Sequence, residues 1–253
     1  MASKWSIAAI GLGAFLSFLL ISFPASVAYR WFAPDAVRLA AIEGTVWRGS
    51  AGLGAIEGLA VSDLRWQLHP SALLRGRLSA TAEGRFRDGF GTATVIASSD
   101  RVVIRNLRAS ARLQSLREVL PIAATEGQLS ATLTELTLVD GWPIGAVGEV
   151  RITGLRVAPL FGPEGANLIE LGDYSARLTS SETPGIVAAL SDQGGPIELA
   201  GRASLLPDRT YRIEGLVRAR PGAPSELVQG LELMSGPPNA NGQRELTPLT
   251  GRL

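Results

Sequence analysis

The chain has 253 residues with nearly balanced charge, 24 Lys+Arg against 23 Asp+Glu. This length fits one all-β domain or two small ones, and the balance excludes the strongly basic surface of a nucleic-acid-binding protein. There are 0 Cys and 1 His, which excludes disulfides, thiolate nucleophiles, zinc ribbons and iron–sulfur sites. His69, followed by Pro70, leaves metal clusters and histidine acid–base pairs without partners. We therefore predict that the chain is not an enzyme and holds no catalytic, metal or cofactor site.

An apolar run without charge extends from Ile7 to Phe23, and Lys4 precedes it. About twenty apolar residues span a bilayer as a helix, and aromatic residues mark the two interfaces. The flanking aromatic residues here are Trp5, Tyr29, Trp31 and Phe32. The pattern predicts an inner-membrane helix from Trp5 to Ala28. Residues 1–30 would form the anchor with a short cytoplasmic N-terminus, residues 7–23 would contact lipid, and residues 31–253 would form a periplasmic β-rich domain.

A cleavable signal peptide is the alternative for this segment. Ser26-Val27-Ala28 places small residues before a possible cleavage site, and Pro24 would break the helix just ahead of it. The apolar run is longer than the usual core of a signal peptide, which favours the uncleaved anchor. Both interpretations export the remainder of the chain.

From Arg38 onward, apolar and polar residues alternate with the period of a β-strand. In residues 77–87 one face carries Leu78, Ala80, Ala82, Gly84 and Phe86, while the other face is polar. Such alternation predicts an antiparallel sheet with one dry face and one wet face. The further strands that we predict are 37–47, 59–68, 91–97, 101–106, 127–138, 145–154, 174–180, 186–190, 197–205, 211–220 and 245–253.

Helix is scarce after the anchor. Ser225–Met234 follows Pro224 and precedes Gly236, which are typical helix boundaries, and residues 115–120 are expected to form a short helical turn. Glycines recur at strand starts, as at Gly44, Gly127, Gly148, Gly201 and Gly251. We interpret them as strand starts and bulges where the sheet coils. The predicted fold is therefore mostly β, an N-terminal transmembrane helix followed by a strongly coiled antiparallel sheet with few short helices.

Two tryptophans lie in adjacent predicted strands, each beside an arginine: Trp47 with Arg48, and Trp66 with Arg65. A tryptophan pair packed across neighbouring strands is one interpretation. A surface that binds a partner is the other, because tryptophan is enriched at binding hot spots. Trp47, Trp66, Arg48 and Arg65 are therefore our candidate interaction residues.

Several segments together resemble a known family. These are Gly44-Thr45-Val46-Trp47-Arg48-Gly49, Leu64-Arg65-Trp66-Gln67-Leu68-His69-Pro70, Leu190-Ser191-Asp192-Gln193-Gly194-Gly195-Pro196 and Tyr211-Arg212-Ile213-Glu214-Gly215. With the N-terminal anchor, they resemble the type II secretion system protein N family, also called general secretion pathway protein N. The resemblance implies a single-pass inner-membrane protein of Gram-negative bacteria with a periplasmic β-rich domain. It implies an accessory role in exporting folded proteins across the outer membrane and brings no catalytic residues.

Two functions of different kinds stay open at this point. In the first, the sheet contacts other type II secretion components or exported proteins, through its edges or its tryptophan-bearing strands. In the second, its small apolar face forms a groove for a lipid or another apolar ligand.

Overall fold

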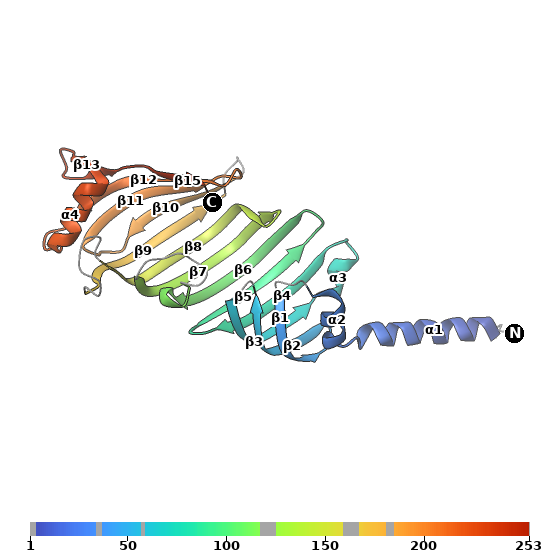
Figure 1. Cartoon of the computed structure of the whole chain (residues 1–253). Helices are drawn as coiled ribbons and strands as arrows, with labels where there is room; N and C mark the ends of the chain where they lie inside the picture. The colour runs from blue at the N-terminus through green and yellow to red at the C-terminus, as the bar shows by residue number, and fades with distance from the viewer. Residues whose placement is uncertain are drawn as a thin grey trace.

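The chain forms one antiparallel sheet in which nearly every strand pairs with its neighbours in sequence (Figure 1). The structure, a computed structural model, describes residues 4–33, 37–56, 59–116, 125–158, 167–180 and 185–252. The helices are α1 (Lys4–Ile21), α2 (Ala25–Phe32), α3 (Pro70–Leu73), α4 (Ser225–Met234) and the 3-10 turn η1 (Leu113–Leu116). The strands are β1 (Val37–Gly44), β2 (Arg48–Ile56), β3 (Leu59–Leu68), β4 (Leu78–Phe86), β5 (Gly89–Ala97), β6 (Arg101–Arg112), β7 (Thr125–Val139), β8 (Trp142–Val157), β9 (Ile169–Thr179), β10 (Ile186–Asp192), β11 (Ile197–Leu205), β12 (Thr210–Ala219), β13 (Ser235–Pro238), β14 (Arg244–Leu246) and β15 (Leu249–Arg252).

The predicted strands are confirmed, half of them longer than expected, and helix Ser225–Met234 has the predicted bounds. Strand β2 was not predicted, because its sequence is rich in glycine and resembles a loop. It forms because both neighbours, β1 and β3, satisfy its backbone groups. The predicted terminal strand is two strands, β14 and β15. The expected helical turn is η1, which ends at Leu116, and residues 117–120 lie outside the described part.

The two faces of the sheet differ in polarity along its whole length. Directly opposite residues lie on the same face. One such row crosses β4 to β12 and holds only small or aliphatic residues: Gly84, Gly91, Ala109, Ala131, Val150, Ala176, Leu190, Gly201 and Gly215. The adjacent row on the other face holds Glu83, Thr92, Arg108, Thr132, Glu149, Arg177, Ala189, Arg202 and Glu214. The predicted dry and wet faces are therefore present.

Bulges coil the sheet. Asp63 has positive φ where the register between β3 and β4 shifts, and Asn106 has positive φ where the register between β5 and β6 shifts. Gly127 and Gly148 lie at further shifts between β7 and β8, which confirms two of the predicted bulge glycines. Gly201 is not at a bulge: it faces Gly215 in an unshifted register. Extra residues of this kind increase the local twist of a sheet.

The coil brings distant hairpins together. The Trp142 indole, at the tip of the β7–β8 hairpin, donates a hydrogen bond of 3.1 Å to the Leu206 carbonyl. The Arg209 guanidinium, in the β11–β12 turn, lies 5.3 Å from the centre of the same ring. Because β9 and β10 separate these hairpins in the strand order, the contacts show that the sheet curls over itself.

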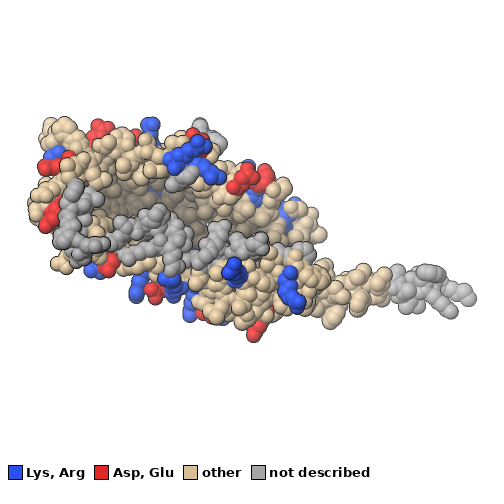
Figure 2. Space-filling model, in the orientation of Figure 1, with Lys and Arg blue, Asp and Glu red and all other residues tan. Residues whose placement is uncertain are grey.

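The apolar face forms the inside of this curl, and we call it the apolar trough. Figure 2 shows a hollow along the molecule lined by uncharged residues, with Arg, Asp and Glu at its rims and on the outer surface. Among the described residues, no large side chain is fully buried. The buried apolar residues are Ala25, Ala51, Val61, Ala111, Leu113, Leu133, Ala146, Ala188 and Val217. The trough is thus a single layer that the described helices leave largely uncovered.

The single helix predicted from Trp5 to Ala28 is instead two helices, α1 and α2, because Pro24 breaks the segment, as the signal-peptide alternative expected. Helix α1 projects away from the sheet (Figure 1). Within the described part of the chain, no helix meets the length and hydropathy that a membrane crossing needs, so the predicted transmembrane helix is not confirmed. Helix α2 lies against β1: the Tyr29 hydroxyl donates to the Val37 carbonyl and accepts from the Leu39 amide, each at 2.9 Å.

Candidate functional site

The polar face of the first four strands has a hollow of about 590 Å³, which we call the polar hollow. Glu43, Ser50, Arg65 and Glu83 form one row of directly opposite residues across β1 to β4. The neighbouring row adds Arg48, Gln67 and Thr81. Arg65 and Glu83 pair at 3.5 Å, but both side chains are more than half exposed, so the pair contributes little stability. The hollow therefore presents cationic, anionic and amide groups to solvent.

The turn between β1 and β2 joins this surface to the N-terminal helices. Gly44 has φ of +86°, a conformation that glycine adopts without strain. The Thr45 amide donates to the Arg48 carbonyl at 2.9 Å, and the Val46 amide donates to the Phe23 carbonyl at 3.0 Å. The Trp47 indole donates to the Leu20 carbonyl, near the end of α1, at 2.8 Å. The Gly44–Gly49 signature thus builds a joint between α1 and the sheet.

Trp66 lies near the end of β3 on the apolar face, directly opposite Gly49 and Ala82. Its indole donates to the Val46 carbonyl at 3.1 Å, and its ring lies against Gly49, where a Cβ would be 2.4 Å from Cζ2. The ring lines the polar hollow and also a hollow of about 370 Å³ at the start of the trough. Glycine at position 49 is therefore required by the position of this ring.

The structure brings together three of the four candidate interaction residues. Arg48, Arg65 and Trp66 all line the polar hollow. Trp47 does not line it and instead contacts α1 through Leu20. Whether any of the four contacts a partner stays a prediction.

His69 closes the signature that contains Trp66. Its Nε2 lies 3.0 Å from Thr81 Oγ1, which lies 3.3 Å from Thr94 Oγ1, so the three side chains form a chain of hydrogen bonds across β4 and β5. In the described ranges, no group of three or more His, Asp or Glu side chains is arranged to hold a metal ion. The histidine therefore has a structural partner within the sheet.

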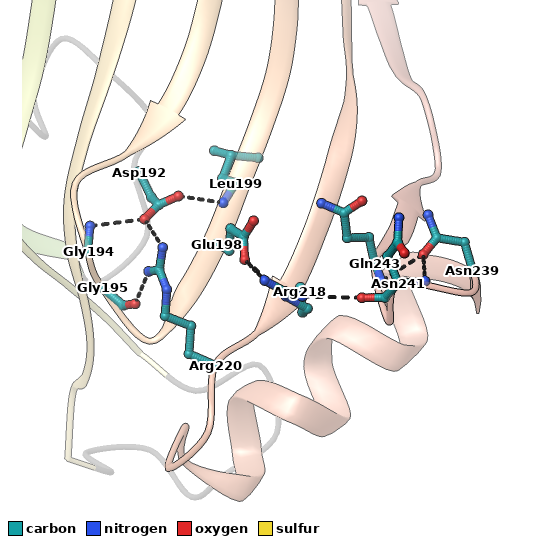
Figure 3. Close-up of polar contacts among 10 residues, drawn as sticks. All are labelled: Asp192, Gly194, Gly195, Glu198, Leu199, Arg218, Arg220, Asn239, Asn241 and Gln243. Atoms are coloured by element: carbon teal, nitrogen blue, oxygen red, sulfur yellow. Dashed lines mark hydrogen bonds and ion pairs between the residues drawn. The ribbon is translucent and has the colours of Figure 1, made fainter.

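A second polar cluster lies at the other end of the sheet, around Asp192 (Figure 3). The Asp192 side chain is 8% exposed and ends β10 on the apolar face, opposite Tyr174. It accepts hydrogen bonds from the Leu199 amide at 2.8 Å, the Gly194 amide at 2.9 Å and the Arg220 guanidinium at 2.7 Å. Arg220 also donates to the Gly195 carbonyl.

These contacts set the protonation of the cluster. Burial opposes ionisation of Asp192, but the two backbone amides and Arg220 outweigh it, so the pKa of this carboxyl lies below its ordinary value. Burial, with the Asp192 charge, raises the pKa of Tyr174 to about 12, although Arg220 acts against the rise. Asp192 is thus a compensated charge within an apolar face.

The sequence alone does not predict this cluster, although the turn from Asp192 to Pro196 belongs to one of the segments that carry the family resemblance. Gly195 in this turn approaches the backbone of β9 so closely that a Cβ would lie 2.2 Å from the Leu171 carbonyl. Arg220 follows 28 positions after Asp192, and only the pairing of β11 with β12 brings it back. The Asp-Gln-Gly-Gly-Pro sequence was the one available signal.

Replacing Gly49 tests the joint. We expect Gly49→Ala to lower the free energy of unfolding by about 2 kcal/mol, because the new methyl group overlaps the Trp66 ring and the Glu43 carbonyl. Gly52→Ala on the same strand is the matched control, since its Cβ would meet one atom, at 3.4 Å. Urea unfolding followed by tryptophan fluorescence measures both. Equal stability of the two variants would contradict the assigned role of Gly49.

Replacing Asp192 tests the second cluster. Asp192→Asn is expected to lower the free energy of unfolding by about 2 kcal/mol at pH 7, through loss of charge-assisted hydrogen bonds. Because the native pKa lies below the unfolded value, this difference is present above about pH 4 and disappears as the pH falls through the native pKa.

Urea titrations of both proteins from pH 7 to pH 2.5 measure this difference. Glu198→Gln is the control: Glu198 pairs with Arg218 at 2.5 Å, but the side chains are 29% and 44% exposed, so less than about 1 kcal/mol is expected. A difference for Asp192→Asn that is independent of pH would show that its carboxylate charge is not responsible.

Comparison with known proteins finds sequence similarity over nearly the whole chain. The family model described as "Type II secretion system (T2SS), protein N" matches residues 35–247. The protein named type II secretion system protein N of Aeromonas hydrophila is 28% identical, with 96% of each chain covered. The protein of the same name from Klebsiella pneumoniae is 30% identical over 90% of this chain and 88% of its own, and that of Vibrio cholerae is 26% identical over 90% and 93%. No solved structure matches the chain significantly.

The matched residues include both signature segments at the joint and the Asp192 turn. The chain therefore belongs to the type II secretion system protein N family.

Proposed function

We propose that this protein is an accessory component of the type II secretion system that supports export of folded proteins by contacting other components in the periplasm. Membership of the family is the observation that carries the proposal. The polar hollow supports a role in protein contacts, because it groups two arginines with a tryptophan at the rim of the sheet. Edge addition has less support, since Tyr29 already bonds the first residues of the free edge of β1.

We also propose that residues 1–30 hold the chain at the inner membrane, with residues 31–253 in the periplasm. The support is the uncharged sequence from Ile7 to Phe23 and the exposure of apolar side chains on α1. Leu12, Phe15, Phe18, Leu20 and Ile21 are each more than half exposed. Exposed apolar surface of this kind needs a lipid or protein partner.

A second candidate function is the binding of an apolar ligand in the trough. The observation that favours it is the uncovered apolar face described above, in which large side chains stay partly exposed. It is compatible with the first function because the polar hollow and the trough lie on opposite faces of the sheet.

The anchor is tested by the mass of the mature protein. We expect intact mass spectrometry of the protein extracted from inner membranes to give the full chain, because Trp47 and Val46 bond residues ahead of position 28. Extraction by alkaline carbonate should leave the protein with the membrane. A mature chain that begins at Tyr29 would contradict the anchor.

The polar hollow is tested by reversing its charges. The double variant Arg48→Glu, Arg65→Glu is expected to reduce secretion of a type II substrate by at least about fivefold and to reduce co-isolation of the other components, because it replaces both cations of the hollow by anions and so removes the charge pattern that a partner would match. The control is Arg202→Glu, Arg212→Glu, two exposed residues of the same face at the other end of the sheet. Unchanged secretion by a folded hollow variant at normal abundance would exclude this surface.

A further inference from the structure

The apolar trough is continuous from α2 to β12. At one end the hollow of about 370 Å³ is lined by Ala28 and Tyr29 of α2 together with Leu39, Ile42 and Leu64 of the sheet. The next hollow, of about 200 Å³, is lined by Val61, Phe86 and Leu107 among others. Beyond this hollow the same face continues to β11 along a row of directly opposite residues: Leu133, Gly148, Leu178, Ala188 and Ala203.

The lining offers almost nothing to a polar occupant. The strands use their backbone groups in the ladders on both sides, and among the described residues Gln114 Oε1 is the one buried side-chain atom without a hydrogen bond. An extended peptide in the trough would leave its own amide and carbonyl groups unpaired, which is costly. A hydrocarbon chain has no such groups.

The distribution of charge in the trough also favours a hydrocarbon chain as the occupant. The row from Gly84 to Gly215 holds no charged residue, and the Asp192 carboxylate, on the same face, is already neutralised by Arg220. A charged ligand would find no free counter-ion along this row. The occupant is therefore uncharged and apolar where it touches the sheet.

The source of such a chain lies at the α2 end. The last turns of α1 expose Leu19, Leu20 and Ile21, and the Trp47 indole bonds the Leu20 carbonyl, so this apolar surface leads directly to the start of the trough. Figure 1 shows that α1 leaves the sheet from this end. A bilayer around α1 would therefore present lipid beside the trough opening.

We propose that the trough holds the acyl chains of a membrane phospholipid, with the headgroup in solvent at its rim. This inference rests on the second candidate function, the binding of an apolar ligand. Burial of the acyl chains would supply the apolar contacts that the single-layer sheet otherwise lacks.

Photo-crosslinking from neighbouring positions on opposite faces tests the occupant. The full chain is prepared with p-benzoylphenylalanine at Leu178, in the trough, or at Arg177, exposed on the polar face. Each protein is reconstituted in vesicles of phosphatidylethanolamine and phosphatidylglycerol and irradiated. The mass of the denatured protein is then measured by mass spectrometry. Strand β9 lies far from α1 in the strand order, so an adduct at Leu178 does not arise from lipid around the anchor.

We expect a phospholipid adduct at position 178 at least about tenfold more abundant than at 177. The same measurement in native cell envelopes separates the alternatives. A protein adduct at position 178 would overturn the lipid proposal and show instead that the trough binds a protein. If a chain with unchanged circular dichroism gave no adduct at position 178, both the lipid proposal and the binding of any apolar ligand in the trough would be overturned. The secretion function does not depend on either result.

A pair of charge insertions gives a second readout. Ala131→Glu places a carboxylate in the trough, and Thr132→Glu places the same group on the polar face of the same strand. Lipid retained after purification is expected to fall at least about tenfold in the first variant and to stay unchanged in the second. Equal retention by the two folded variants would contradict the proposal.

Discussion

An apolar sheet face without a second layer is the constraint on which the rest of this structure depends. Most β-domains cover such a face with another sheet or with helices, but here α1, α2 and α4 lie at the two ends of the sheet, and α3 and η1 are single short turns between strands. The chain reduces the exposed apolar area by coiling. Bulges at Asp63, Asn106 and Gly148 increase the twist, and the Trp142 indole holds two distant hairpins together.

Three polar side chains on or beside this face, Asp192, Trp66 and Trp47, have hydrogen-bond partners. Asp192 is ionised there only because two amides and Arg220 compensate it. Trp66 and Trp47 place their indole N–H groups on backbone carbonyls, Val46 and Leu20, so that the rings stay at the rim.

The sequence predicted the strands correctly wherever apolar and polar residues alternate. Alternation predicted nearly all of the strands, and Pro24 predicted the break between α1 and α2. It failed for β2, whose glycines carry no alternation, and for the two-part end formed by β14 and β15. Three of the four candidate residues share a hollow, but Arg220 was not foreseen as the partner of Asp192, since that pairing depends on the return of β12.

The order of the strands has a consequence for how the molecule is made. Because β2 to β11 each pair with the strand just before and the strand just after in sequence, none of these strands waits for a distant partner. Such local topology lowers the loop-closure entropy of each strand pairing. The sheet can therefore grow strand by strand from its N-terminal end. The exceptions are β14 and β15, which both pair with β12 across the inserted α4 and β13, and Gly251 of β15 lies beneath the Tyr211 ring. The last residues of the chain therefore complete an edge that was laid down some forty residues earlier.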